Sequence, residues 1–488
     1  MPESYDFDLL CIGSGPAGQR AAIQATKLRK RVAVVERLQI VGGVCVATGT
    51  IPSKTFREAV LSFVVRDSLF DGRVGHHGEN RPTAEQLLRR VDRVIQREAQ
   101  VVEDQLWRND VQVIRGEATF KESHTLTVVS AEETRMVTAD KILIAVGTQP
   151  AIPRGVDVDG EIILTSAQVM HMKRLPRRMV VVGGGVIGIE YASMFAALEL
   201  DVTVIDKRVR PLEFIDDEIV DELMHQMRNH DVTFRLGEAV ERLEISQGPP
   251  RQVVIHLDSG KVITSDLAFF SAGRQGATDR LNLEAAGLKA DARGLLMVDQ
   301  QFRTAVPHIF AAGDVIGYPS LAATSAEQGR LAAYFAFGVE SKPMATHFPV
   351  GIYSIPEISI VGAHEQELTA KKIPYEIGVA RYREIARGQI LGDDSGLVKL
   401  LFHRDDHRLL GVHAIGTGAT ELIHIGQAVL GLGAGLDYFL DTVFNYPTLA
   451  ECYKVAALNA SNKLLRDSLA SERSGEPLID RPPQGGKR

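Results

Sequence analysis

Short apolar runs, each followed by a glycine-rich turn and then an alanine-rich stretch, are the first regular pattern along this chain. In residues 7–36 an apolar run over 7–12 predicts a buried strand, and the alanine-rich stretch predicts a helix to about residue 30. A second strand is predicted over 31–35, and it ends at an acidic residue, Glu36. Apolar strands that alternate with helices are typical of α/β folds with parallel sheets.

The same plan recurs in residues 178–206. Strands are predicted over 178–182 and 202–205, with a helix to about residue 199 between them, and the second strand ends at Asp206. An internal duplication of this kind predicts two similar α/β units in one chain.

Each predicted strand-to-helix turn carries Gly-x-Gly-x-x-Gly, at residues 13–18 and again at 183–188. The first glycine permits a tight turn, the second lets the backbone approach a pyrophosphate, and the third packs helix against strand. The helix N-terminus offers unpaired N–H groups to the phosphates. Glu36 and Asp206 both stand 23 positions after the first glycine, where a carboxylate can accept hydrogen bonds from a ribose diol. We therefore expect two Rossmann-like units and two bound dinucleotides.

The residues that follow the two acids differ. Asp206 is followed by Lys207 and Arg208, whereas Glu36 is followed by Arg37 alone. A carboxylate favours the free 2′-hydroxyl of NAD, and nearby Lys or Arg can accommodate the 2′-phosphate of NADP. The second unit is therefore predicted to accept both nucleotides; the competing interpretation is a solvated charge cluster at a strand end.

The remaining chain is organised more simply. Apolar residues at i, i+3 and i+4 spacing predict helix within 66–106. From 351 to about 465, strand patterns such as 375–382 and 397–402 alternate with helices rich in Ala and Leu. Residues 466–488 are polar and rich in Pro and Gly, and we expect them to form a disordered tail.

Composition narrows the class of protein. The 488 residues carry a net charge of −7 without a basic tract, which argues against a dedicated DNA or RNA binder. Apolar stretches stop well short of about 18 residues and the N-terminus lacks signal-peptide features, so we expect no membrane span and a cytoplasmic location. Three cysteines (Cys11, Cys45 and Cys452) cannot build a disulfide framework.

Residues 41–54 read Val-Gly-Gly-Val-Cys-Val-Ala-Thr-Gly-Thr-Ile-Pro-Ser-Lys. Here the chain resembles the flavoprotein disulfide reductase family, which includes dihydrolipoamide dehydrogenase and glutathione reductase. That family carries Gly-Gly-x-Cys-x4-Cys-Ile-Pro-Ser-Lys, and its two cysteines form a redox disulfide beside the flavin. Cys45 matches the first cysteine, but Thr50 stands at the second position, so this disulfide cannot form.

The resemblance covers all of the chain but the tail, and it implies FAD at the first unit and NAD(P) at the second. Asp314, in Phe-Ala-Ala-Gly-Asp, matches the family's second flavin motif, whose acid binds the ribitol chain. Lys54 and Glu190 match a buried pair that in the family lies near the flavin N5 atom. A lysine there stabilises the anionic reduced ring, and the glutamate holds the lysine in place.

The resemblance implies three sets of site residues. The flavin set is Gly13, Gly15, Pro16, Ala17, Gly18, Glu36, Arg37, Gly43, Val44, Cys45, Lys54, Gly116, Ala118, Ala145, Gly147, Gly313, Asp314, Leu321 and Ala322. The nicotinamide nucleotide set is Gly183, Gly185, Ile187, Gly188, Asp206, Lys207, Arg208, Gly273 and Arg274. The catalytic set is Lys54, Glu190, Cys45, Thr50, Tyr446 and Glu451.

Near the C-terminus the family uses His-x-His-Pro-Thr-x-x-Glu, whose second histidine is the general base of the thiol chemistry. Residues 444–451 read Phe-Asn-Tyr-Pro-Thr-Leu-Ala-Glu, so Tyr446 stands at the base position and Glu451 at the final acid. A phenol, with a pKa of about 10, is a poor base at neutral pH. The second cysteine and the histidine are therefore missing together, while the flavin and nicotinamide motifs remain.

These matched losses are similar to the pattern of one subgroup, the Si-specific soluble pyridine nucleotide transhydrogenases. The resemblance implies an oxidoreductase that moves a hydride from NADPH by way of flavin N5 to NAD+, without a redox disulfide. An NAD(P)H:quinone reductase (diaphorase) of the same family is the alternative, and a flavin-bearing redox sensor is the non-enzymatic one.

The family's domain plan follows from the same resemblance. It implies an FAD-binding domain in two parts, 1–150 and 275–350, an NAD(P)-binding domain over 151–274, and an α+β dimerisation domain over 351–465. In the family each active site borrows the segment matching 446–451 from a second chain, which implies a homodimer, with a higher oligomer as a further option. We expect nicotinamide nucleotides and a second copy of the chain as partners, and no nucleic acid, membrane or metal.

Some interpretations stay open. Cys45 is either a buried remnant of the disulfide or a redox-sensing thiol whose pKa a nearby charge lowers. Tyr446 either packs over the flavin or hydrogen-bonds Glu451. His424 is expected to pack within its helix rather than reach an active site across a dimer. His76 and His77, in a polar loop, are not expected to bind a metal.

Overall fold

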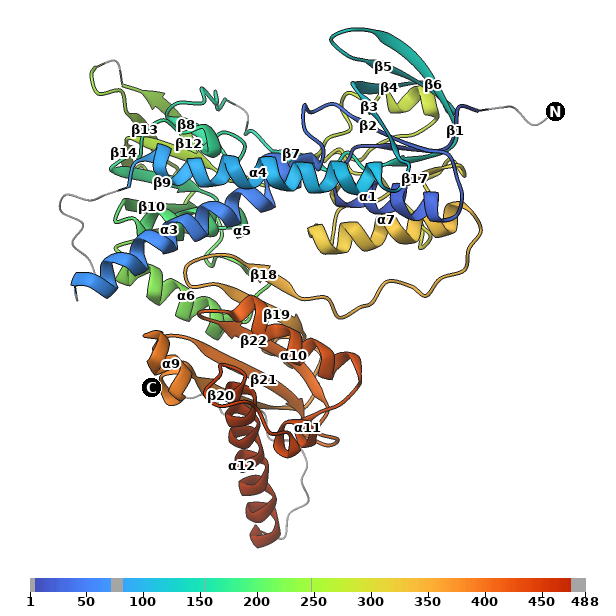
Figure 1. The fold of residues 1–488 in the computed structure, drawn as a ribbon. Coiled ribbons are helices and arrows are strands. Elements are labelled where there is room, and N and C mark those ends of the chain that lie inside the picture. Colours follow the sequence, from blue (N-terminus) through green and yellow to red (C-terminus); the bar gives the residue numbers. More distant parts are fainter. Residues whose placement is uncertain (1–4, 72–81, 154, 247, 475–488) are drawn as a thin grey trace. The chain divides into compact units, whose positions relative to one another are not determined.

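The computed structural model describes residues 5–71, 82–153, 155–246 and 248–474 (Figure 1). The chain divides into two compact units. The first comprises Met1–Pro211 and His230–Thr346, and the second comprises Leu212–Asn229 and His347–Arg488. Each unit is described by itself.

The first copy of the duplication builds a sheet of seven strands in the order β3-β2-β1-β6-β5-β4, with β17 beside β6. Strands β3, β2, β1, β6 and β17 are parallel neighbours, and β5 and β4 extend the sheet in antiparallel fashion. The strands are β1 (Phe7–Ile12), β2 (Val32–Glu36), β3 (Gln112–Arg115), β4 (Glu117–Glu122), β5 (Thr125–Val129), β6 (Thr134–Ile144) and β17 (Ile309–Ala311). Every residue of β2 is buried, as its continuous apolar run predicts.

Helices α1 (Pro16–Lys27) and α7 (Ala322–Ala336) lie side by side against this sheet (Figure 1). Their backbones can approach closely because Gly329 has no side chain: a Cβ there would lie 2.0 Å from the carbonyl oxygen of Ala17. This contact joins the first flavin-type segment to the second, more than 300 residues later in the chain.

The second copy builds a parallel sheet in the order β11-β10-β9-β15-β8, with helix α5 (Val186–Ala197) after its glycine turn. Its strands are β8 (Ile163–Thr165), β9 (Arg178–Val182), β10 (Asp201–Asp206), β11 (Thr233–Leu236) and β15 (Leu267–Phe270). An antiparallel sheet of β12 (Val240–Ile245), β13 (Val253–Leu257) and β14 (Val262–Ser265) packs its apolar side chains against it. A ribbon of β7 (Thr148–Pro150) and β16 (Arg274–Gly276) lies where the chain enters and leaves this part.

Three further helices belong to the first unit: α2 (Gly43–Ala47), α3 (Thr50–Asp71) and α4 (Ala84–Trp107). The helix predicted within 66–106 is therefore two helices, and Thr83 begins the second with a capping box that includes Gln86. His76 and His77 fall between them and lie outside the described residues.

The second unit contains an antiparallel sheet in the order β18-β19-β22-β21-β20. Its strands are β18 (Val350–Ile352), β19 (Ile358–Gly362), β20 (Tyr375–Arg381), β21 (Leu397–His403) and β22 (Leu409–Ile415). Its helices are α6 (Asp217–Asn229), α8 (Glu365–Ala370), α9 (Ala386–Leu391), α10 (Ala419–Gly431), α11 (Leu436–Asp441) and α12 (Glu451–Ser474). Helix α12 lies against β20 (Figure 1), where a Cβ on Gly378 would stand 2.0 Å from the carbonyl oxygen of Ala456.

Two features of this unit differ from the sequence predictions. Helix α6 lies within residues 151–274, predicted to form the NAD(P)-binding domain, yet it groups with the C-terminal residues. Residues 466–474, predicted to begin the tail, belong to α12, which continues to Ser474 through a run without Gly or Pro. Residues 475–488 lie outside the described part of the chain.

Most predicted elements of the duplication are confirmed to within three residues at their ends, and the mixed α/β class is confirmed. Among the described residues, no helix is both long enough and apolar enough to cross a bilayer.

Candidate functional site

Both glycine turns have the same tight geometry. A Cβ on Gly18 would lie 1.9 Å from the carbonyl oxygen of Gly13, and one on Gly188 would lie 1.9 Å from that of Gly183. The first glycine of each turn has a positive φ, +105° at Gly13 and +110° at Gly183. The third glycine therefore lets each helix start directly beside its strand, as the motif predicts.

The middle glycine of each turn faces open space. A Cβ on Gly15 or on Gly185 would meet no atom within 4 Å. Helices α1 and α5 begin at these glycines without a side-chain cap, so their first N–H groups are left for another acceptor. Open space in front of uncapped helix N-termini fits a pyrophosphate in both copies of the duplication.

Glu36 is 4% exposed at the end of β2, and its carboxylate is held in place by hydrogen bonds. Its Oε2 accepts from the Ser14 backbone N at 3.0 Å and from the Ser14 hydroxyl at 2.5 Å. Its Oε1 accepts from the Leu38 backbone N at 2.8 Å. The acid is thus tied to the glycine turn, where a ribose following the pyrophosphate would lie.

Asp206 has the same place in the second copy of the duplication. Its Oδ2 accepts from the Gly184 backbone N at 2.5 Å, and its Oδ1 accepts from the Arg208 backbone N at 2.8 Å. The Arg208 guanidinium adds two more bonds, Nε to Oδ1 at 3.0 Å and Nη2 to Oδ2 at 2.6 Å. Burial raises the pKa of Asp206, but the bonds from Arg208 and Gly184 outweigh it and hold the pKa below its usual range. Lys207 is exposed.

Lys54 on α3 and Glu190 on α5 form an ion pair. The Lys54 Nζ donates to Oε1 of Glu190 at 2.9 Å and to Oε2 at 2.8 Å. The glutamate side chain is 4% exposed and that of the lysine is 25% exposed. Lys54 follows the first copy of the duplication and Glu190 lies in the second, so the pair forms where α3 meets α5. Glu190 is therefore a buried, paired carboxylate and not an ordinary charged residue on a helix surface.

Cys45 on α2 is a free cysteine, partly buried, and the Thr50 side chain hydrogen-bonds it. Burial raises the pKa of the Cys45 thiol above its usual range; Thr50 and Lys54 oppose that shift, while Asp314 and Glu98 add to it. A thiol with a raised pKa is largely protonated at neutral pH and a weak nucleophile. The pKa shift therefore favours the buried-remnant interpretation over the redox-sensing one.

Asp314 lies near Cys45 and belongs to a chain of polar contacts in the same unit. Its Oδ1 accepts from the Ser325 hydroxyl at 3.2 Å, and its Oδ2 accepts from the Thr148 hydroxyl at 3.5 Å. Arg274 donates from Nε to the Thr148 hydroxyl at 2.7 Å and from Nη2 to the Thr148 carbonyl at 2.6 Å. Burial lowers the pKa of Arg274, and Asp314 opposes that shift. This series of polar contacts connects the β7–β16 ribbon to the second flavin-type motif.

The other residues implied for the flavin lie on several elements of the first unit. The Gly116 backbone N donates to the Glu36 carbonyl at 2.9 Å, and a Cβ on Gly13 would lie 2.5 Å from the carbonyl oxygen of Ala145. Leu321 is the N-cap of α7 and Ala322 is its first residue, and both follow Asp314 in the sequence. Ala118 is buried in the core of the sheet. The remaining members are on or next to these elements: Pro16, Ala17, Arg37, Gly43, Val44, Gly147 and Gly313. Of the residues implied for the nicotinamide nucleotide, Ile187 lies in the first turn of α5 and Gly273 precedes β16.

Tyr446 and Glu451 lie in the second unit. Tyr446 is 72% exposed, and the buried Oε2 of Glu451 has no hydrogen-bond partner among the described residues. This excludes a bond from Tyr446 to that oxygen within one chain. His424 is exposed on α10 and bonds Gln427 at 2.8 Å, so the prediction that it packs within its helix is wrong. Helix α10 turns its apolar face to the sheet and leaves position 424 outside.

Sequence reasoning missed several polar residues that support these sites: Ser14, Thr148, Ser325 and Gln328. Ser14 bonds Glu36, and the Gln328 side chain accepts from the Gly313 backbone N at 2.8 Å. Ser14 could have been found, since it is the variable position between two motif glycines. Thr148, Ser325 and Gln328 carry no local signal.

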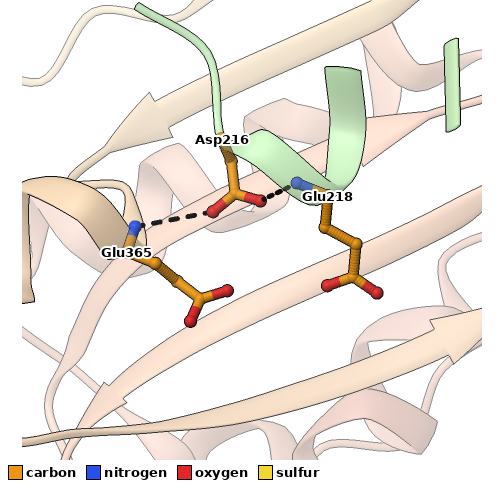
Figure 2. Close-up of side chains that lie close together, drawn as sticks. All are labelled: Asp216, Glu218 and Glu365. Atoms are coloured by element: carbon orange, nitrogen blue, oxygen red, sulfur yellow. Dashed lines mark hydrogen bonds between the residues drawn. The ribbon is translucent and has the colours of Figure 1, made fainter. Parts of the chain in front are cut away.

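Three carboxylates of the second unit, Asp216, Glu218 and Glu365, gather as in Figure 2, with one oxygen of each within 4.8 Å of the others. Such a set could bind a cation. Here the cation is Lys399 of β21, fully buried, whose Nζ lies 2.8 Å from Asp216 and 3.1 Å from Glu218, and also contacts Glu365. The ammonium group already pairs with all three acids, so the cluster is an ion-pair network joining α6 and α8 to the sheet.

Comparison with known proteins places this geometry in context. Residues 7–329 match the family described as pyridine nucleotide-disulphide oxidoreductase. Residues 348–457 match its dimerisation domain.

Among curated relatives, the soluble pyridine nucleotide transhydrogenase of Mycobacterium bovis is 52% identical over 461 residues, covering 94% of this chain and 98% of that protein. The soluble pyridine nucleotide transhydrogenase of Photobacterium profundum is 43% identical over 465 residues, with the same coverage of both chains.

Among solved structures, LpdA from Mycobacterium tuberculosis superposes with a TM-score of 0.84 at 26% identity, covering 92% of this chain and 99% of that one. The HOCl-induced flavoprotein disulfide reductase RclA from Escherichia coli gives a TM-score of 0.84 at 25% identity, with the same coverage.

Proposed function

The chain belongs to the pyridine nucleotide-disulphide oxidoreductase family, and from this premise we propose that it is an FAD-dependent soluble NAD(P)+ transhydrogenase. The proposed reaction is NADPH + NAD+ ⇌ NADP+ + NADH. The observation that carries the proposal is the pairing of an intact Lys54–Glu190 ion pair with a Cys45 that faces Thr50 instead of a second thiol.

The first unit fits FAD. The space beside Gly15 and the uncapped start of α1 suit its pyrophosphate, Glu36 suits a ribose diol, and Asp314 suits the ribitol chain. When bound, FAD supplies a carrier that accepts a hydride from one nicotinamide and returns it to another. The chain itself then has to hold the carrier, fix the charges around it and bind the two nucleotides.

Lys54 supplies the fixed charge in this proposal. Glu190 holds its ammonium group with both carboxylate oxygens, so the lysine does not have to reorganise when negative charge develops nearby. The Glu190 side chain is 4% exposed, so water screens the Lys54–Glu190 pair poorly. The electrostatic effect of the pair is therefore larger than it would be in solution.

Both nucleotides would use the single site at residues 183–188 and Asp206. The second copy of the duplication has one open glycine turn, at Gly185, and one acid placed for a ribose. If NADPH and NAD+ bind there in turn, the first product leaves before the second substrate binds. Ping-pong kinetics follow from this order of events.

Thiol chemistry has no part in this proposal. All three cysteines of the chain are free, and Cys11 and Cys452 are buried. Burial raises the pKa of Cys452 to about 12 and raises that of Cys11 further still. A dithiol relay would need two reactive thiols in contact, and Cys45 has only Thr50 in that place.

We further propose that the working form is a homodimer in the cytoplasm. The dimerisation domain matched over residues 348–457 supports self-association. Free cysteines are usual where glutathione and thioredoxin keep thiols reduced. The exposed Tyr446 is the surface that a second chain would cover, as the family's shared active site implies.

The test is an anaerobic assay of the purified, FAD-loaded protein with NADPH as donor and thio-NAD+ as a spectrally distinct acceptor. We expect fast formation of thio-NADH with parallel lines in double-reciprocal plots, and slow reduction of a quinone under the same conditions. If the quinone is reduced and thio-NAD+ is not, the quinone reductase alternative holds instead. Bound FAD without turnover towards either acceptor would favour the redox sensor.

A further inference from the structure

Ser14 bonds two parts of the first unit, the acid that ends β2 and the residue that precedes α2, which come 22 and 28 residues later in the chain. The side chain of Ser14 is fully buried. Its hydroxyl donates to Oε2 of Glu36 at 2.5 Å and accepts from the Gly42 backbone N at 2.8 Å. A hydroxyl has one proton, so the bond to the carboxylate orients it and leaves a lone pair for Gly42. One side chain therefore joins the glycine turn, the acid and the start of α2.

The second copy of the duplication builds the same turn without this side chain. Gly184 stands at the position of Ser14, and its backbone N bonds Asp206 at 2.5 Å. The backbone N of Ser14 makes the matching bond to Glu36 at 3.0 Å. The backbone bond is thus common to both copies and completes the turn even with glycine. The Ser14 hydroxyl is an addition, and it belongs to the copy that continues into α2.

Helix α2 begins directly on the glycine turn. A Cβ on Gly43, the first residue of α2, would lie 3.0 Å from the Cα of Gly15. Gly42, the N-cap residue, has no side chain with which to cap the helix. The Ser14 hydroxyl therefore supplies a polar contact at the point where α2 meets the turn.

A tight connection joins α2 to α3, which carries Lys54. The Gly49 backbone N donates to the Val44 carbonyl at 2.7 Å. A Cβ on Gly49 would lie only 2.8 Å from the same carbonyl oxygen, so the end of α2 and the start of α3 are in close contact. Because Lys54 lies near the start of α3, a movement of α2 would also move Lys54.

We propose that Ser14 is a positioning residue, whose hydroxyl anchors the start of α2 to the glycine turn and thereby holds Cys45 and Lys54 in place. Glu190 anchors the same segment at its other end, through both carboxylate oxygens. A charge held at both ends of its segment does not have to reorganise when negative charge develops nearby. The inference rests on the proposed function for the role of Lys54, whereas the anchoring of α2 depends on the chain alone.

The test is backbone amide hydrogen exchange, measured by mass spectrometry on the full chain with FAD bound. Two variants remove the hydroxyl: Ser14→Ala, and Ser14→Gly, which has the residue that the second copy has at Gly184. Ser265→Ala is the matched control. Ser265 is also a buried serine of the first unit, and its hydroxyl donates to the carbonyls of Arg178 at 2.9 Å and Leu267 at 3.0 Å.

We expect peptides that cover residues 42–49 to exchange about fivefold faster or more in both Ser14 variants than in the wild type, because the bond to the Gly42 N–H is lost. Peptides from the core strands β1 and β6 should exchange at the wild-type rate within about twofold. In Ser265→Ala the exchange of residues 42–49 should also stay within about twofold of the wild type, since the lost bonds lie in another sheet.

A kinetic measurement separates positioning from a purely structural role. The rate at which saturating NADPH reduces the bound FAD should fall about tenfold in Ser14→Ala, because the charge of Lys54 is displaced. The NADPH concentration that gives half of the maximal rate should stay within about twofold, since the turn at residues 183–188 is unchanged. Faster exchange at α2 with an unchanged rate of reduction would overturn the positioning role.

Unchanged exchange over residues 42–49 in both Ser14 variants would overturn the inference. A rise of similar size throughout the first unit would do the same, because Ser14 would then contribute to overall stability only. A variant that loses FAD is compared with the wild type stripped of FAD, so the exchange result still decides. Faster exchange at α2 in a chain whose wild type does not form thio-NADH would keep the anchoring and remove the proposed function, and the reverse result would do the opposite.

Discussion

At the scale of single residues, Cys45 and Lys54 lie nine positions apart in one segment and have opposite chemical environments. Burial raises the pKa of the Cys45 thiol and thereby makes it a weak nucleophile. Lys54 is held by both oxygens of Glu190, a pairing suited to a fixed positive charge. The segment resembles a disulfide motif, yet its functional side chain is the lysine at its end.

This contrast predicts the outcome of two substitutions. Cys45→Ser should retain transhydrogenation within about threefold, because no step needs a thiolate. Lys54→Met should lower the rate by about 100-fold or more, since it removes the fixed charge and leaves Glu190 unpaired. The rate of thio-NADH formation by each FAD-loaded variant, with NADPH as donor and thio-NAD+ as acceptor, measures both effects. A large loss in Cys45→Ser with FAD still bound would return thiol chemistry to consideration.

At the scale of elements, the glycine turns and their acids could be predicted from the sequence, because every contact in them is local to the motif. Gly18 packs on Gly13 within the turn, and Glu36 bonds Ser14, 22 residues earlier in the same copy of the duplication. The bond between Thr148 and Asp314 could not be predicted, since 166 residues separate its partners and the motif around Asp314 does not say which hydroxyl it bonds. The same holds for α6, whose amphipathic pattern fits any apolar surface and does not say which one it covers.

The turn geometry predicts two different defects from one kind of substitution. Gly18→Ala should destabilise the fold by about 1–3 kcal/mol, because its Cβ would clash with the Gly13 carbonyl and neither backbone can move away easily. Gly15→Ala meets no atom within 4 Å, so the fold should be kept while FAD binding weakens, since the methyl group takes the space of the pyrophosphate.

Unfolding midpoints of the two apoproteins, together with FAD titration by fluorescence quenching, distinguish these defects. Equal losses of stability in Gly15→Ala and Gly18→Ala would mean that the space beside Gly15 has a structural role only.

At the scale of the whole molecule, the buried charges of the second unit connect stability to pH. His413 is fully buried on β22: its Nε2 bonds the Ala363 carbonyl at 2.9 Å, and its Nδ1 has no partner among the described residues. Burial lowers the pKa of His413 to about 4, although Asp216 and the Ala363 carbonyl favour protonation and Lys399 and His364 disfavour it. The pKa of Asp216 is also lowered, because Lys399 and His413 outweigh the effect of burial, so this acid stays ionised over the same range.

The sign of the pH effect follows from His413. Its folded-state pKa lies below the unfolded value of about 6.5, so the unfolded chain binds a proton that the folded chain does not. Stability should therefore fall by an amount on the order of 2–3 kcal/mol as the pH drops from about 6.5 to about 4. Thermal unfolding between pH 7 and pH 4.5 should show a smaller decline for His413→Gln than for the wild type, while His424→Gln, which changes an exposed histidine, should follow the wild type.

The Lys399 network also sets an order of events during synthesis. Asp216 leaves the ribosome 183 residues before the lysine that will pair with it. At the usual speed of translation, about 5–20 residues per second, that interval lasts about 10–40 s. During this interval the apolar face of α6, which includes Ile219 and Leu223, has no β21 to pack with. Its acids are also without the lysine that pairs with them in the folded chain. The nascent chain is therefore open to chaperones and proteases at α6 until β21 has been made, and it cannot fold strictly in the order in which it is synthesised.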